Sequence, residues 1–123
     1  MKNILTVLCA LASMLLISSC VQNNTICYHK IVYEVSSSPA VNMDIHFINS
    51  GNESYMTPAV GSFFSQECPG IISGWRAYIS ASAIPNPDYP VETRITIKIF
   101  LDDVLVTQTT DQDRAQLEYI VPE

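Results

Sequence analysis

The sequence predicts an all-β domain, an immunoglobulin-like antiparallel β-sandwich of about seven strands that follows a cleaved helical signal peptide. Three observations predict this class. Apolar and polar residues alternate with a period of two in several short segments. The alternating residues are mostly β-branched or aromatic, and turn-forming residues separate the segments at regular intervals. Such a pattern fits an immunoglobulin-type sandwich, with a small barrel as the structural alternative.

The N-terminal segment has the pattern of a lipoprotein signal peptide, which we assign to residues 1–19. Lys2 supplies a short positive region, and a mostly apolar stretch follows over residues 4–17. This stretch is short for a transmembrane span but fits the hydrophobic region of a signal peptide. It ends in Ile-Ser-Ser-Cys at Cys20, which resembles the bacterial lipobox. An ordinary secretory signal in which Cys20 is incidental is the alternative.

We therefore expect the mature protein to begin at Cys20 and to carry diacylglycerol and an N-linked acyl chain such as palmitate there. Several acyl chains would tether it stably to a membrane without spanning it. Residues 20–27 would form the tether and residues 28–123 the β-sandwich domain. Val21 is not the Asp that retains enterobacterial lipoproteins at the inner membrane, and residues 21–25 lack an acidic surface-export tag. The expected location is the cell envelope, at the periplasmic face of the outer membrane.

In the first half of the domain, alternating segments are separated by clusters of Ser, Pro, Asn and Gly. Such clusters indicate turns, and the Asn-Ser-Gly-Asn sequence is a strong signal for a hairpin. The predicted strands are residues 28–35, 41–48, 53–57 and 60–66, of which the last is the least regular. The predicted turns are Ser36–Pro39, Asn49–Asn52 and Cys68–Gly70.

The second half begins with an alternating segment, followed by a loop with three prolines and a hairpin with the clearest pattern in the chain. The predicted strands are residues 75–81, 94–101, 104–107 and 117–121, with a loop over 84–90 and turns at Asp102–Asp103 and Asp111–Arg114. With a two-residue loop in the hairpin, Leu101 faces Val104 and Ile99 faces Val106. Asp-Asp is a poorer type I′ turn than Asp-Gly, which leaves a longer loop open.

The cysteines fall into three groups. Cys9 is removed with the signal peptide, and Cys20 receives lipid. Cys27 and Cys68 remain as an even pair in an oxidising compartment, and we predict a disulfide bond between them. It would close a loop of about 40 residues. Two buried thiols are the alternative.

The charge and the polar residues exclude some function classes. The mature chain carries five Lys and Arg and twelve Asp and Glu, a net charge of −7, which disfavours binding to nucleic acid. No catalytic set, metal site or cofactor motif is apparent. Asp44 and His46 share a strand face and could serve a small-ligand-binding or hydrolytic site, although such pairs usually lie on a solvated face. Four carboxylates, Asp102, Asp103, Asp111 and Asp113, are better explained by turns than by calcium.

Two large apolar residues are candidates for an interaction surface. Phe100 and Leu105 pair on the face opposite the isoleucine stripe of the hairpin. If that face is solvated, the pair marks a small apolar patch, and if it packs under the proline-rich loop, it belongs to the core.

Several segments resemble the MmpS family of small mycobacterial membrane proteins. They are Lys-Ile-Val-Tyr-Glu-Val from Lys30, the alternating strand 41–47, Tyr-Ile-Ser-Ala-Ser from Tyr78, and the hairpin over 95–106. The resemblance implies an immunoglobulin-like sandwich outside the cytoplasmic membrane that acts as an accessory to lipid and siderophore exporters. Here Asp103 stands where the family usually has Gly, and the anchor is lipid rather than a transmembrane helix.

Together these features predict a non-enzymatic, lipid-anchored module of the cell envelope. It would act in binding or as a transport accessory, with the membrane as one partner and an envelope protein or transporter as another. A surface-exposed structural or adhesive lipoprotein is the alternative from a different class.

Overall fold

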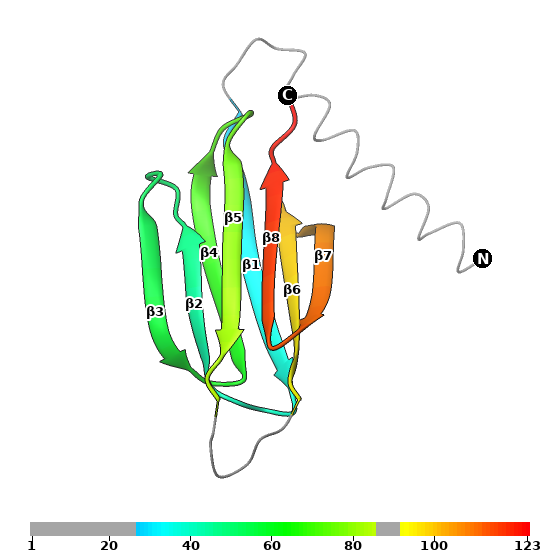
Figure 1. Cartoon of the computed structure of the whole chain (residues 1–123). Helices are drawn as coiled ribbons and strands as arrows, with labels where there is room; N and C mark the ends of the chain where they lie inside the picture. The colour runs from blue at the N-terminus through cyan, green and yellow to red at the C-terminus, as the bar shows by residue number, and fades with distance from the viewer. Residues whose placement is uncertain (1–26, 86–91) are drawn as a thin grey trace, which may run out of the picture.

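The computed structural model describes residues 27–85 and 92–123 (Figure 1). The predicted signal peptide, most of the tether and most of the proline-rich loop lie outside the described residues. The described part consists of eight strands and contains no helix. They are β1 (His29–Ser38), β2 (Met43–Ile48), β3 (Ser54–Val60), β4 (Phe63–Ile71), β5 (Arg76–Ala83), β6 (Arg94–Leu101), β7 (Val104–Gln112) and β8 (Arg114–Ile120).

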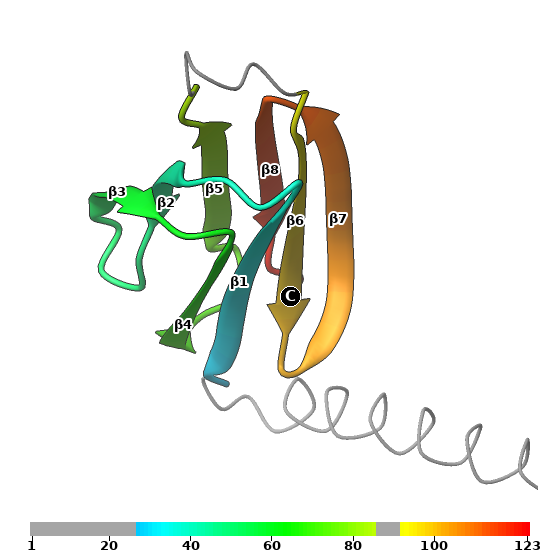
Figure 2. The same ribbon diagram turned by 90° about the horizontal axis from the view of Figure 1, so that it is seen from below.

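The strands form two antiparallel sheets of four strands each. The first sheet has the order β4-β1-β6-β7, and the second has the order β3-β2-β5-β8. Figures 1 and 2 show the two sheets facing each other, with β7 and β8 next to one another along one side of the sandwich. The predicted all-β sandwich is confirmed, with eight strands rather than about seven.

The core lies between the sheets because inward residues recur with a period of two. In β6 every second residue from Ile95 to Leu101 is buried, and β1, β2 and β5 show the same alternation. The fully buried large side chains include Ile31, Tyr33, Val35, Met43, Ile45, Ile79, Ile95, Ile97 and Ile99. The polar residues between them face outward, which is why the sequence alternates.

The turn predicted at Cys68–Gly70 is wrong, because β4 continues through these residues to Ile71. Pro69 is tolerated there because β4 is an edge strand, where a missing N–H removes no ladder hydrogen bond from a second neighbour. Gly70 has a φ of 71° and lies in a bulge, since Ile31 pairs with Cys68 but His29 pairs with Ile71. The Cys-Pro-Gly sequence therefore marks a bulge rather than a chain reversal.

The hairpin between β6 and β7 has the predicted two-residue loop, and Leu101 pairs with Val104. The predicted pair of Ile99 with Val106 is wrong, because Ile99 pairs with Thr107. Phe100 pairs with Leu105, so Val106 is an extra residue in β7 and forms a bulge. At the far end of β7, the turn was predicted over Asp111–Arg114. In the structure β7 extends to Gln112 and β8 begins at Arg114, so Asp113 alone connects them.

One end of the sandwich, which we call the N-terminal end, is where β1 begins. The strand pairing also places there the end of β4, the β6–β7 turn, the β2–β3 loop and the end of β8. In Figure 1 this is the upper end, and the described C-terminus lies there too. The opposite end carries the β1–β2 and β3–β4 connections and the β7–β8 link at Asp113.

Candidate functional site

The predicted interaction surface lies on the outer face of the β4-β1-β6-β7 sheet. Four residues form a row across its four strands: Glu67 pairs with Val32, Val32 with Phe100, and Phe100 with Leu105. Val32 and Phe100 are half-buried, and Leu105 is 42% exposed. We call Val32, Phe100 and Leu105 the Phe100 row. Because cross-strand neighbours on one face touch, the row is one continuous apolar strip.

The predicted pair of Phe100 and Leu105 is confirmed as a cross-strand pair on this outer face. The alternative, packing under the proline-rich loop, is disfavoured by the spacing along β6. Arg94, the residue at which β6 begins after that loop, is six residues from Phe100, or about 20 Å along the strand. The row therefore lies toward the N-terminal end, away from where the loop joins the strand.

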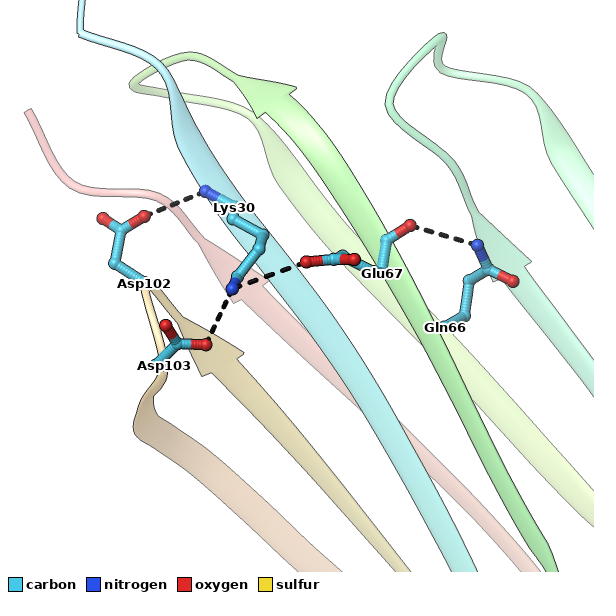
Figure 3. A network of polar contacts seen from close by, with 5 residues as sticks. All are labelled: Lys30, Gln66, Glu67, Asp102 and Asp103. Carbon is cyan, nitrogen blue, oxygen red and sulfur yellow. Dashed lines mark hydrogen bonds and ion pairs between the residues drawn. The ribbon is translucent and has the colours of Figure 1, made fainter.

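Figure 3 shows a network of charged side chains around Lys30. The Lys30 ammonium lies 2.8 Å from the carboxylate of Asp103 and 3.4 Å from that of Glu67. Lys30 precedes Val32 by two residues and therefore lies on the same face of β1. The hydrogen bond with Asp103 raises the pKa of Lys30 above its usual value and keeps the side chain charged. The row thus has a charged border on the side of the N-terminal end.

The β6–β7 turn is fixed to β1 through Asp102. Its backbone N–H donates to the Lys30 carbonyl at 2.9 Å, and its carboxylate accepts the Lys30 N–H at 3.0 Å. The other carboxylate oxygen lies 2.6 Å from Nδ1 of His29, whose side chain is only 10% exposed. Asp102 and Asp103 have φ values of 49° and 68°, which makes the loop a type I′ turn. The first aspartate positions the turn, and the second pairs with Lys30.

The turn gives a testable prediction for Asp103. Its left-handed backbone strains a residue with a Cβ by about 1 kcal/mol, which glycine avoids, while an exposed ion pair contributes little stability. Asp103→Gly should therefore raise the free energy of unfolding, as measured by urea denaturation. Asp113→Gly is the control, because Asp113 also has a positive φ but its carboxylate accepts the N–H of buried Thr93 at 3.1 Å. If Asp103→Gly is as destabilising as Asp113→Gly, the ion pair outweighs the strain.

Asp44 and His46 lie on the outer face of the other sheet, and both side chains are exposed. His46 is hydrogen-bonded through Nε2 to the hydroxyl of Ser54, on the neighbouring strand β3. The two residues share a face as predicted, but that face is open to solvent on a sheet surface. Water is therefore not excluded from Asp44 and His46, although its exclusion strengthens electrostatic interactions at a reacting centre.

The predicted disulfide bond between Cys27 and Cys68 is not formed in the structure. Cys68 pairs with Ile31, whereas Cys27 precedes Ile31 by four residues, which is about 13 Å of extended chain. Disulfide bonds join Cα atoms about 4.4–6.8 Å apart. The Cys68 side chain points into the core, where burial raises the pKa of its thiol to about 11.

Within residues 27–85 and 92–123, no three His, Cys, Asp or Glu residues lie close enough together to hold a metal ion. The four aspartates considered for calcium are divided between the two ends of β7. No helix in the described residues is long and apolar enough to cross a membrane.

Two features of the structure could not be found by reading motifs. The Lys30 network joins β1, β4 and the β6–β7 turn, whose relative positions no sequence signal specifies. Tyr33 lies in a predicted strand, and no motif indicates that its hydroxyl contacts the opposite sheet: it donates to the Ile48 carbonyl at 2.9 Å and accepts the Tyr78 N–H at 3.2 Å.

Neither a protein-family model nor a curated protein matches this chain. The class of the domain therefore follows from its own geometry: it is an eight-stranded antiparallel β-sandwich with a polar-bordered apolar strip on one outer face.

Proposed function

We propose that the chain is a lipid-anchored protein of the cell envelope whose β-sandwich acts as a non-enzymatic binding or transport-accessory module. The signal peptide pattern and the lipobox at Cys20 support the anchor and the location. In this proposal, the domain is held at the periplasmic face of the outer membrane and meets an envelope protein or transporter there. The resemblance to MmpS proteins supports the accessory role.

The observation that carries the binding function is the Phe100 row. Outer faces of sheets in soluble sandwiches are usually polar, so an apolar strip across three strands is a candidate contact for another protein. Leu105 is its most exposed member, at 42%, and the Lys30 network supplies charges at its border. Apolar contact with charged residues around it is the usual composition of a protein interface.

Site-specific photocrosslinking tests this proposal. A photoreactive amino acid replaces Leu105 in cells that make the full chain, and in a second strain it replaces Gln116, an exposed residue on the outer face of the other sheet. We expect a discrete crosslinked protein from position 105 and none from position 116. An excess of wild-type chain should suppress the product, and an excess of the Leu105→Asp variant should not. Crosslinks of equal pattern at both positions, or none at position 105, would contradict the proposal.

The alternative hydrolytic function on the Asp44/His46 face draws support only from the contact between His46 and Ser54. Imidazole and hydroxyl are the groups of a serine nucleophile and its base, but both are exposed here. The binding module is therefore the function that the geometry favours.

A further inference from the structure

The exposed large apolar side chains are distributed unevenly over the domain. Nine such side chains are found in the described residues. Six belong to the half of the sandwich at the N-terminal end: Tyr28, Tyr55, Ile72, Val104, Leu105 and Ile120. Met56 lies near the middle of its sheet, and Phe63 and Ile84 lie at the opposite end. Strand propensity alone would not produce this asymmetry, because both ends have similar numbers of strand termini.

These side chains surround the N-terminal end rather than lying on one strand. Tyr28 precedes β1, Ile72 follows β4, Val104 begins β7, and Ile120 ends β8. Tyr28 and Ile120 are 68% and 60% exposed. Since both sheets contribute, the apolar groups form a ring at the end of the sandwich.

The chain that precedes the domain leads away from this same end. Cys20 is seven residues before Cys27, the first described residue, and seven residues span at most about 25 Å. A lipid on Cys20 would hold the N-terminal end within that distance of the bilayer. The opposite end lies a further strand length away, about 30 Å for the nine residues of β7. Only the apolar end would therefore be kept close to the membrane.

The charges at this end indicate which lipid surface it fits. Among the described residues, the two cations closest to this end are already paired: Lys30 with Asp103 and Glu67, and Arg76 with Glu118 at 2.6 Å. These two side chains are therefore not free to attract anionic lipid. Carboxylates near the ring would repel anionic headgroups, so the matching surface is zwitterionic.

We propose that the N-terminal end of the sandwich seats on a zwitterionic bilayer surface, with Val104, Ile120 and their neighbours inserted among the lipid headgroups. This inference rests on the lipid anchor of the proposed function. The tether keeps the end at high effective concentration next to the bilayer, so a small apolar area suffices for seating. The seat would fix the orientation of the Phe100 row relative to the membrane.

Tryptophan quenching tests the seat. The mature, acylated protein is reconstituted in phosphatidylcholine vesicles whose acyl chains are brominated. Trp75 is the only tryptophan and is replaced by Phe, and a new tryptophan is placed by Val104→Trp or Ile120→Trp. Both positions are far from the tether in sequence, and Phe63→Trp at the opposite end is the matched control. We expect an approximately twofold loss of emission at positions 104 and 120, because interfacial apolar groups lie about 5–10 Å deep, and no loss at position 63.

The possible results distinguish the contact of the N-terminal end with the bilayer, which we call the seat, from the lipid anchor on Cys20. If the protein floats with the vesicles but emission is unchanged at positions 104 and 120, or falls equally at position 63, the seat is refuted and the anchor stands. Dimerisation through the ring in place of quenching also refutes the seat. If the protein does not float and Cys20 carries no acyl mass, the anchor and the seat both fail. Should Trp75→Phe unfold the domain, amide exchange of the wild type decides, with slowing expected near 104 and 120 in vesicles relative to detergent micelles.

Discussion

Tyr33→Phe is expected to lower the free energy of unfolding by about 2 kcal/mol, since removing one partner of buried hydrogen bonds leaves the others unsatisfied. For a domain of this size that corresponds to a fall in Tm of about 10 °C. Tyr33 belongs to β1, but its hydroxyl bonds to β2 and β5 in the opposite sheet. The effect is large because a single oxygen atom is hydrogen-bonded to two strands.

The Tyr33 hydroxyl lies where the backbone hydrogen bonds between β2 and β5 end. Phe47 and Ile79 form the last pair between β2 and β5 at this end, and Ile48 and Tyr78 come next. The Tyr33 oxygen accepts from the Tyr78 N–H and donates to the Ile48 carbonyl, so it bridges the strands where the ladder stops. Burial raises the pKa of Tyr33 far above its usual value, which keeps the hydroxyl protonated and able to donate. Phenylalanine would keep the ring contacts and lose only this bridge.

Urea denaturation measures the difference, and Tyr55→Phe is the control. Tyr55 also loses one hydroxyl, but that hydroxyl bonds to the exposed carboxylate of Glu53 at 3.1 Å. Its removal should leave the free energy of unfolding close to that of the wild type. Equal effects of the two substitutions would show that the bridge between the sheets contributes no special stability.

Cys20→Ala is expected to abolish acylation of the protein completely. Under the proposed function, the lipids on Cys20 are the stable attachment, since two or more acyl chains hold a protein where one holds it marginally. The signal peptide would also escape cleavage at the lipobox, because the modified cysteine is the substrate of that step. The variant should carry no palmitate label and accumulate as the uncleaved precursor.

Labelling with palmitate and the size of the protein on a gel measure this loss of acylation and cleavage. Cys9→Ala is the matched control, because Cys9 lies in the hydrophobic region of the same signal peptide but not at the lipobox. It should leave both labelling and size unchanged. Retention of the label and of the mature size in Cys20→Ala would contradict the lipoprotein assignment.

Much of the fold could be predicted because the two faces of each central strand differ. The alternation from Ile95 to Leu101 specifies both the strand and its inward face. The Asp-Asp sequence left a two-residue and a longer loop open, and the structure has the two-residue loop. Edge strands were harder to predict. The signals for a bulge and for a turn both consist of Pro and Gly, so Cys68–Gly70 was assigned as a turn although it continues β4.

The interactions between strands distant in sequence could not be predicted. The disulfide bond was inferred from an even number of cysteines, which says nothing of the spacing between Cys27 and Cys68. The Phe100–Leu105 pair could be found because both residues lie in one hairpin. The Lys30 contacts with Glu67 and Asp103 could not, because they depend on β1 lying between β4 and β6.

Asp113 is the whole connection between the two sheets at one side of the sandwich. The Asp113 N–H donates to the Thr93 carbonyl at 2.7 Å, and the Asp113 carbonyl accepts the Ala83 N–H at 2.9 Å. A connection of one residue cannot lengthen, so a shift in the register of β7 against β6 requires a shift of β8 against β5. A slip of one residue would turn the inward side chains of both strands outward at once. The last two strands are thus a single mechanical unit that locks the alignment of one sheet to that of the other.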